Sequence, residues 1–176
     1  MKSSRIFLVG VAGAALLASS ALAENWPAWR GPTGQGVSTE SGLPLEWSQT
    51  KNVRLKTPLP GPGNSTPIVW GGKVFINQAS GPKGQRRELM CFDRRTGKTL
   101  WKKGVTYSEE ETTHKTNPQC SGSPATDGER VVVSFSSGGV FCYDMNGKEL
   151  WKKILGSRIT SGATAPRPSF TATCVC

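Results

Sequence analysis

The residues of this sequence with the most obvious chemical potential are acids and one histidine. Asp93 and Asp144 recur at one position of a repeated segment, and His114, the single histidine, follows a run of three glutamates at 109–111. Carboxylates can ligate a divalent cation or transfer protons together with a histidine. The glutamate run lacks the Asp/Asn spacing of a cation-binding loop, and no Ser, Cys or carboxylate constellation accompanies His114. We therefore assign no catalytic, cofactor-binding or metal-binding residue, and we expect a solvated loop here.

The aspartates belong to a segment that the chain contains twice. Residues 89–103 return as residues 140–153, each copy with an aromatic-Asp pair, a Gly-Lys turn and a Leu-Trp-Lys-Lys ending. Internal repetition at a period of this size is typical of solenoids and propellers. Because Asp93 and Asp144 recur with the repeat, we interpret both as structural caps, whose side chains accept hydrogen bonds from the backbone of the following turn.

Short alternating segments surround both copies and predict four strands in each unit. Gly-Gly, Thr-Gly-Lys, Asp-Gly and Asn-Gly-Lys turns separate them. Four strands in up-and-down order are typical of a propeller blade. The predicted fold is therefore all-β, a partial β-propeller of two four-stranded antiparallel blades. The predicted strands are 67–70, 73–78, 88–93 and 99–104 in the first unit, and 123–126, 130–135, 139–144 and 149–155 in the second.

Residues 91–101 resemble the aromatic-Asp-x-x-Thr-Gly-Lys-x-x-Trp motif of the pyrroloquinoline-quinone (PQQ)-like propeller repeat. In that family the outer-strand Trp packs on the Gly-containing turn of a neighbouring blade. The resemblance implies this blade-docking role for Trp101 and Trp151, with Gly97 and Gly147 as turn partners. The segment 25–32, with Trp-Pro-x-Trp-Arg-Gly-Pro, resembles the start of an exported, planctomycete-type group of these proteins.

The N-terminus has the pattern of a secretory signal peptide. Lys2 and Arg5 precede an apolar run at 6–17, and Ala21 and Ala23 provide a small-x-small cleavage site. An uncleaved anchor is the alternative. We expect export to the periplasm or the extracellular space, with no transmembrane span after cleavage.

The remaining organisation follows from the repeat. Leu55 stands where the tryptophan stands in residues 99–103, so we expect residues 53–59 to be the outer strand that closes a propeller ring. Beyond Gly156 the pattern stops, and reading the codons one base earlier permits Ser-Ser-Pro-Val-Leu-x-Gly-Asp, which matches residues 65–72. We expect an out-of-frame tail, and an ordinary divergent tail is the alternative. The predicted units are a signal peptide (1–23), an extended arm (24–52), the ring-closing strand (53–59), blade 1 (60–106), a polar loop (107–119), blade 2 (120–156) and the tail (157–176).

The chain has five cysteines and a net charge of +10, which could indicate disulfides and a nucleic-acid partner. The positions of these residues favour neither. Cys91 and Cys142 occupy the same repeat position beside the aromatic-Asp pair, so we interpret them as small buried apolar residues and predict no disulfide. The basic residues are scattered over turns and strand ends, without a nucleic-acid-binding module. We expect a solvated basic surface and no nucleic-acid partner.

Two blades bury little surface, since propellers use about 4–8 blades. We therefore expect a fragment whose missing blades are partners, from an exported propeller that is a non-catalytic scaffold or binding module for a protein or glycan. The resemblance keeps one enzymatic alternative open, a PQQ-dependent alcohol or sugar dehydrogenase with PQQ and Ca²⁺ as cofactors. The fragment itself contains neither a vicinal cysteine pair nor a Ca²⁺ ligand set. A truncated gene product without autonomous function is the third possibility.

Overall fold

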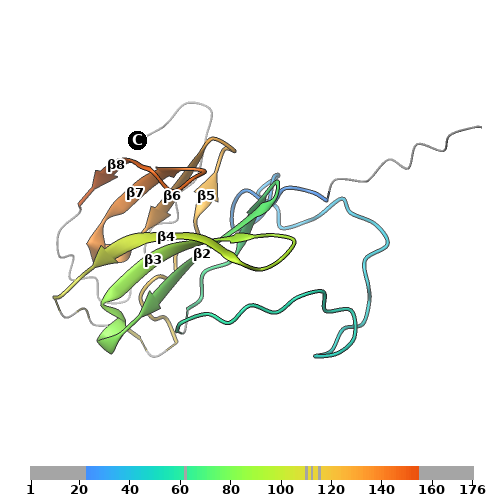
Figure 1. Cartoon of the computed structure of the whole chain (residues 1–176), viewed down its shortest axis with the longest axis horizontal. Helices are drawn as coiled ribbons and strands as arrows, with labels where there is room; N and C mark the ends of the chain where they lie inside the picture. Colours follow the sequence, from blue (N-terminus) through green and yellow to red (C-terminus); the bar gives the residue numbers. More distant parts are fainter. Residues whose placement is uncertain (1–22, 62, 110, 112, 115, 155–176) are drawn as a thin grey trace, which may run out of the picture.

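The computed structural model describes residues 23–61, 63–109, 111, 113–114 and 116–154, which form eight strands in two sheets (Figure 1). Each sheet is antiparallel, with four strands in chain order. The predicted all-β fold of two four-stranded blades is confirmed. The first sheet contains β1 (Ile68–Trp70), β2 (Lys73–Ser80), β3 (Arg86–Asp93) and β4 (Thr99–Thr106), and the second contains β5 (Ala125–Thr126), β6 (Arg130–Ser134), β7 (Val140–Asp144) and β8 (Glu149–Lys153).

The repeated sequence gives the two sheets the same register. Cys91 lies opposite Trp101 between β3 and β4, and Cys142 lies opposite Trp151 between β7 and β8. A shift of register follows each cysteine directly, at Cys91/Phe92 and at Cys142/Tyr143. A bulge at this point increases the local twist and re-aims the following side chains. Each outer-strand tryptophan therefore lies at the same position relative to the bulge of its sheet.

Each strand differs from its predicted range at one end, by one or two residues. β2 continues to Ser80 and β3 begins at Arg86, because the loop between them closes in one short 3-10 turn, η1 (Pro82–Gly84), in which the Gln85 N–H donates to the Pro82 carbonyl. β5 is only a two-residue strand. A second 3-10 turn, η2 (Ser136–Gly138), connects β6 to β7.

The ring-closing strand, the signal peptide and the tail are the three predicted units that do not appear as described elements of the structure. Residues 53–59 form no strand. The predicted signal peptide, Ala23 excepted, and the predicted out-of-frame tail lie outside the described residues.

The two sheets stack face to face around one apolar core (Figure 1). Alternation along the strands sends every second side chain into the space between the sheets. The first sheet contributes Ile68, Phe75, Leu89 and Cys91, all fully buried, to this core. The second sheet contributes Val131, Val133, Phe141 and Tyr143. Neither sheet could bury these side chains alone, so the interface between the sheets is the main apolar core of the described chain.

The opposite face of the second sheet carries an apolar row at the same repeat positions as a row on the covered face of the first, with smaller residues on its first two strands. Register aligns Ile68, Phe75, Cys91 and Trp101 in one cross-strand row of the first sheet, which lies in the core. The equivalent row of the second sheet is Ala125, Val132, Cys142 and Trp151. Because Val131 and Val133 point into the core, alternation turns Val132 and this second row away from the first sheet.

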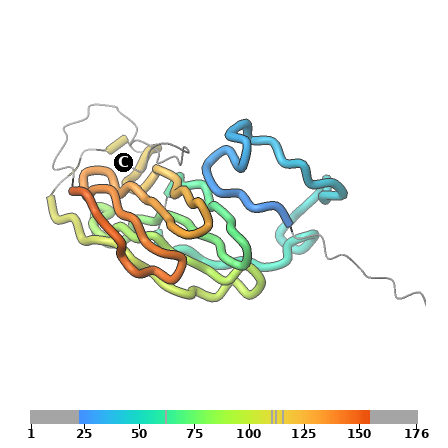
Figure 2. Tube along the Cα trace, turned by 90° about the horizontal axis from the view of Figure 1, so that it is seen from above, coloured from blue at the N-terminus to red at the C-terminus, as the bar shows by residue number. Residues whose placement is uncertain are grey.

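The N-terminal arm attaches to the first strand of each sheet. Trp26 and Val69 exchange two backbone hydrogen bonds of 2.8 Å, and the Thr126 N–H donates to the Pro27 carbonyl at 2.9 Å. The arm therefore joins β1 to β5. The blue tube in Figure 2 then loops away from the sheets, and this loop carries strongly exposed apolar side chains such as Leu45 and Trp47.

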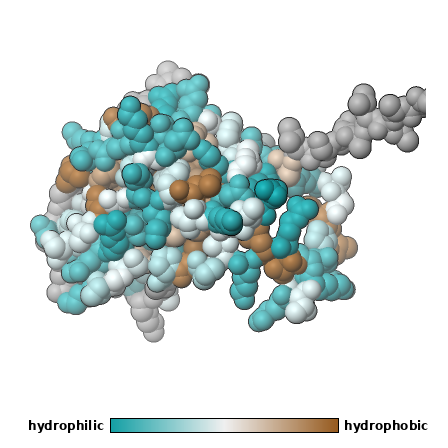
Figure 3. Space-filling model, viewed as in Figure 1, coloured by the Kyte–Doolittle hydropathy of each residue, from teal (hydrophilic) through white to brown (hydrophobic). Residues whose placement is uncertain are grey.

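The surface in Figure 3 is mostly hydrophilic, with scattered apolar patches. Over the described part of the chain, no helix has the length and apolar character that crossing a bilayer requires.

Candidate functional site

The seam between the two sheets contains most of the residues that the sequence singled out. Trp101 projects from β4 onto the turn after β7, where its indole Nε1–H donates to the Met145 carbonyl at 3.3 Å. Its ring centroid lies 5.8 Å from that of Phe75 and 6.2 Å from that of Tyr143. The indole therefore contacts both sheets, with its polar atom bonded to the turn of the second.

Gly147 is the residue of that turn beneath the indole. Its φ of +84° lies in the left-handed region, which residues other than glycine adopt at a cost. A Cβ atom built on Gly147 would lie 2.8 Å from Trp101 Cδ2, closer than real Cβ contacts come. Glycine is thus required twice, for the turn conformation and for the close approach of the ring.

Gly97 occupies the equivalent turn of the first sheet, and residues 53–59 lie against it. The Thr57 hydroxyl donates to the Gly97 carbonyl at 3.2 Å, and a Cβ on Gly97 would lie 3.2 Å from Leu55 Cδ1. Thr57 and Leu55 together therefore occupy on Gly97 the place that Trp101 occupies on Gly147. A cavity of about 170 Å³ remains between this segment and the outer face of the first sheet, with Leu59 and Phe92 among its lining residues.

Trp151 is the counterpart of Trp101 in the second sheet and is half-buried. A turn that received it would belong to a following repeat, beyond residue 154, where the described residues end. Its strand neighbour Leu150 and the nearby Ile154 are exposed by 45% and 58%. The second sheet therefore presents a tryptophan with apolar neighbours on the side that faces away from the first sheet.

Asp93 and Asp144 accept hydrogen bonds within their own turns. Asp93 Oδ1 accepts from the Thr96 N–H at 2.7 Å and from the Thr96 hydroxyl at 2.6 Å. Asp144 Oδ1 accepts from the N–H groups of Asn146 at 2.8 Å and Lys148 at 2.9 Å. Both carboxylates are thus engaged in holding the glycine turns that receive Leu55 and Trp101.

These hydrogen bonds hold the pKa of both carboxyls below the usual value, Asp93 chiefly through the Thr96 hydroxyl and Asp144 chiefly through the Lys148 N–H. A carboxyl with a depressed folded-state pKa stabilises the fold above its unfolded pKa of about 3.9, and this contribution is lost as the pH falls through the folded value. We expect the ¹³C resonances of both carboxyls to titrate below pH 3.9 in the folded chain and near it in urea. Equal midpoints in the two states would contradict the capping role.

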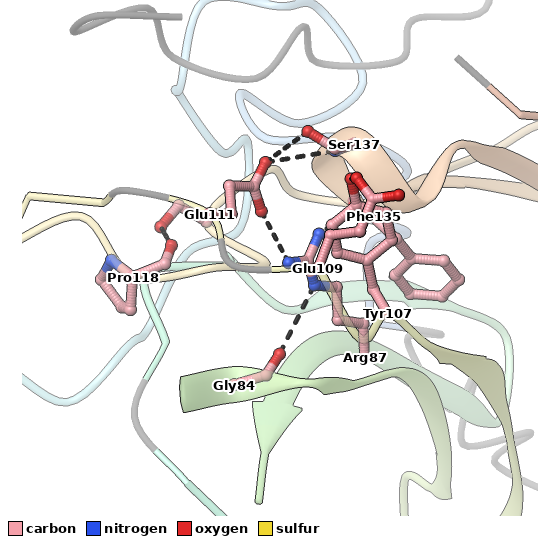
Figure 4. A network of polar contacts seen from close by, with 9 residues as sticks. Gly84, Arg87, Tyr107, Glu109, Glu111, Pro118, Phe135 and Ser137 are labelled. Atoms are coloured by element: carbon pink, nitrogen blue, oxygen red, sulfur yellow. Dashed lines mark hydrogen bonds and ion pairs between the residues drawn. The ribbon is translucent and has the colours of Figure 1, made fainter. Parts of the chain in front are cut away.

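A buried arginine forms the second part of the seam (Figure 4). The Arg87 side chain is 1% exposed, and its guanidinium donates to the Phe135 carbonyl at 2.7 Å and to Glu111 at 2.6 Å. It also lies 4.6 Å from the centroid of the Tyr107 ring. The other Glu111 oxygen accepts from the Ser137 hydroxyl at 2.6 Å. The charged pair thus joins β3, the loop after β4 and η2.

The expectation of a solvated loop is wrong for Glu111, since its carboxylate is mostly buried against Arg87 and Ser137. The predicted strand 88–93 leaves Arg87 outside it, and Arg87 instead lies inside β3. Period-two alternation provides the missed signal, because Arg87 shares the parity of Leu89 and Cys91, which point into the core.

Two further polar side chains of the first sheet, Asn77 and Lys73, cross the seam. The buried Asn77 amide donates to the Gly122 carbonyl at 3.2 Å and the Ser134 carbonyl at 3.0 Å. The Lys73 ammonium donates to the Met145 carbonyl at 2.6 Å, the same atom that accepts from Trp101. Side chains of the first sheet thus satisfy backbone carbonyls of the second, as buried polar groups require.

The remaining candidates for chemistry stay apart from one another. His114 is exposed, and its Nδ1 lies 2.8 Å from the Thr116 hydroxyl. Within the described ranges, no group of three His, Cys, Asp or Glu side chains could hold a metal ion. Cys91, Cys120 and Cys142 are buried free thiols, and burial raises the pKa of Cys91 and of Cys120 to about 12. A thiol with such a pKa is a poor nucleophile at neutral pH.

A comparison with known protein families gives a match over most of the chain. Residues 34–176 match the family model described as outer membrane protein assembly factor BamB. This match extends through the segment for which an out-of-frame reading was predicted. Among solved structures, the chain is similar to a europium-containing methanol dehydrogenase, with 26% identity and a TM-score of 0.36 over 49% of this chain and 14% of that chain. The comparison with curated proteins gives no match.

Proposed function

This chain belongs to the family described as outer membrane protein assembly factor BamB, a family of PQQ-like repeat proteins, and we propose that it is part of an exported propeller that acts as a non-catalytic scaffold or binding module. Its ligand would be a protein or a glycan outside the cytoplasm. The family description refers to outer-membrane assembly, and the signal-peptide pattern supports export.

One observation carries the proposal: the recurring polar residues, which would be the first candidates for chemistry, are engaged in holding the sheets together. Asp93 and Asp144 fix the turns, and Trp101 donates its only polar hydrogen to the turn of the second sheet. Arg87 and Glu111 neutralise each other at the seam. A general base must be able to take up a substrate proton. Hydrogen bonds from their own turns lower the pKa of Asp93 and Asp144, which makes both carboxylates weaker bases.

The missing blades are the first partners that we propose. The second sheet repeats, on its outer face, the row that the first sheet buries under the second. A third blade would place its glycine turn on Trp151 as the second blade places Gly147 on Trp101. On the other side, Leu55 and Leu59 lie over the outer face of the first sheet, where the last blade of a ring would lie.

The non-catalytic role is tested by adding PQQ and Ca²⁺ to the chain and measuring alcohol-dependent reduction of a redox dye. We expect no dye reduction above that given by free PQQ with Ca²⁺. The same preparation is applied to a glycan array and to an unfolded outer-membrane barrel protein, and saturable binding to either probe is expected. Alcohol-dependent turnover that requires both the chain and the quinone would overturn the proposal and favour the dehydrogenase alternative.

A further inference from the structure

The backbone nitrogen of Glu24 lies 2.6 Å from the Oε1 atom of Glu40. The Glu24 side chain points to the same segment, where its Oε2 accepts from the Ser38 hydroxyl at 2.6 Å and from the Thr39 N–H at 3.4 Å. Three contacts therefore connect Glu24, the first residue after Ala23, to residues 38–40 of the same arm. The predicted cleavage site lies between Ala23 and Glu24.

Glu24 directly precedes the residues that join the two sheets. The Asn25 side-chain oxygen accepts from the Gly71 N–H at 2.7 Å, and Trp26 and Pro27 bond to β1 and β5. Whatever fixes the position of Glu24 therefore limits the freedom of the segment that crosses the seam. In a chain that still carries the leader, the Glu24 nitrogen is an uncharged amide with one hydrogen to donate.

Cleavage after Ala23 changes this nitrogen. Hydrolysis adds water across the peptide bond, so that Ala23 leaves as a carboxylate and Glu24 gains a free α-amine. The ordinary pKa of an α-amine is about 7.7–8.0, so the new group is mostly a cation at neutral pH. We propose that processing turns this hydrogen bond into an ion pair between the Glu24 α-ammonium and the Glu40 carboxylate, and that the pair acts as an anchor that holds Glu24, and with it the segment that crosses the seam, more firmly in the mature chain.

The charges around the nitrogen favour this pair. The carboxylates of Glu40 and of Glu24 itself lie close to it, and Arg94 is the neighbouring cation, with Nη1 at 3.5 Å from the Ala23 carbonyl. Cleavage removes that carbonyl, and Arg94 keeps its contact with the Gly71 carbonyl at 3.4 Å. Two anions against one cation raise the pKa of the α-amine, so the anchor persists at neutral pH and is lost as the pH rises through the folded value.

The inference rests on the export that we propose, so the experiment tests the two separately. The chain is expressed with its leader in a host that exports it, and the N-terminus of the product is sequenced. The pKa of the α-amine is then measured from the pH dependence of the Glu24 Cα shift. Hydrogen exchange is followed at the Trp26 and Val69 amides in the processed chain and in a chain extended by one alanine before Glu24. Each of these two chains is measured with Glu40 and with the substitution Glu40→Gln. Glu46→Gln, which removes an exposed acid paired with Lys51 in the same arm, is the matched control.

We expect cleavage after Ala23 and an α-amine pKa above the ordinary value, because carboxylates neighbour the amine. Glu40→Gln should return this pKa to the ordinary range and speed exchange at Trp26 and Val69 several-fold in the processed chain, with a smaller effect in the extended chain and none from Glu46→Gln. An uncleaved chain, or cleavage at another bond, would overturn both the export and the anchor. Correct cleavage with an ordinary pKa, or with equal effects of Glu40→Gln in both chains, would overturn the anchor alone.

Discussion

Replacing Trp101 with alanine is expected to lower the free energy of unfolding by about 3 kcal/mol, the lower end of the range for loss of a packed Trp side chain. The half-buried indole fills the space between Phe75, Tyr143 and Gly147, and its hydrogen bond to Met145 disappears with it. Gly147, which lies beneath the ring, has no side chain that could fill the space. Urea denaturation followed by circular dichroism provides the measurement.

Trp151→Ala is the matched control. The same residue type lies at the same repeat position, opposite the equivalent cysteine, and among the described residues no glycine turn lies against its ring. We expect a loss of about 1 kcal/mol, set by partial burial alone. If Trp151→Ala destabilises the chain as much as Trp101→Ala, contact with the next glycine turn is not what stabilises the pair of sheets.

Replacing Arg87 with methionine is expected to cost about 3 kcal/mol, because removal of one partner from a buried ion pair leaves the other charge uncompensated. Methionine fills much of the space of the arginine stem, so the loss reports the missing guanidinium contacts with Glu111 and the Phe135 carbonyl. Thermal or urea unfolding of the variant, compared with the unmodified chain, measures the change.

Arg86→Met is the control for this variant, since Arg86 is the neighbouring residue and its side chain is half-exposed, although its partner Glu88 is mostly buried. Water still reaches the Arg86 guanidinium and screens this pair, so we expect a smaller change than for Arg87→Met. The double variant Arg87→Met with Glu111→Leu should recover part of the loss, because it removes the unpaired carboxylate. Equal effects of Arg86→Met and Arg87→Met would show that the seam does not depend on the buried pair.

The repeat in the sequence was sufficient to predict the sheets. Period-two alternation and glycine turns located all four strands of each unit, since such signals are local. The contact of Trp101 with Gly147 was expected only from the family resemblance. The sequence could not supply it otherwise, because nothing local tells a tryptophan which distant turn it meets.

The differences concern segments whose conformation depends on distant partners. Residues 53–59 have the pattern of an outer strand, but a strand needs a hydrogen-bonded neighbour, and among the described residues this segment lies against the Gly97 turn and the outer face of the first sheet without pairing to a strand. The sequence places Glu111 beside other glutamates, which predicts a solvent-exposed side chain. Its pairing with Arg87 explains why the carboxylate is mostly buried instead. Such pairs form between residues far apart in sequence, where composition carries no signal.

The most direct test of blade docking is a double-mutant cycle between Trp101→Ala and Gly147→Ala. In the unmodified chain, Gly147→Ala introduces both a left-handed alanine, at a cost of about 1 kcal/mol or more, and a clash with the indole. Without the indole only the first cost remains. We predict that the two losses fall short of additivity by about 1–2 kcal/mol in the double variant. Strict additivity would mean that Trp101 does not pack on the Gly147 turn, and it would contradict the account of how the two sheets are joined.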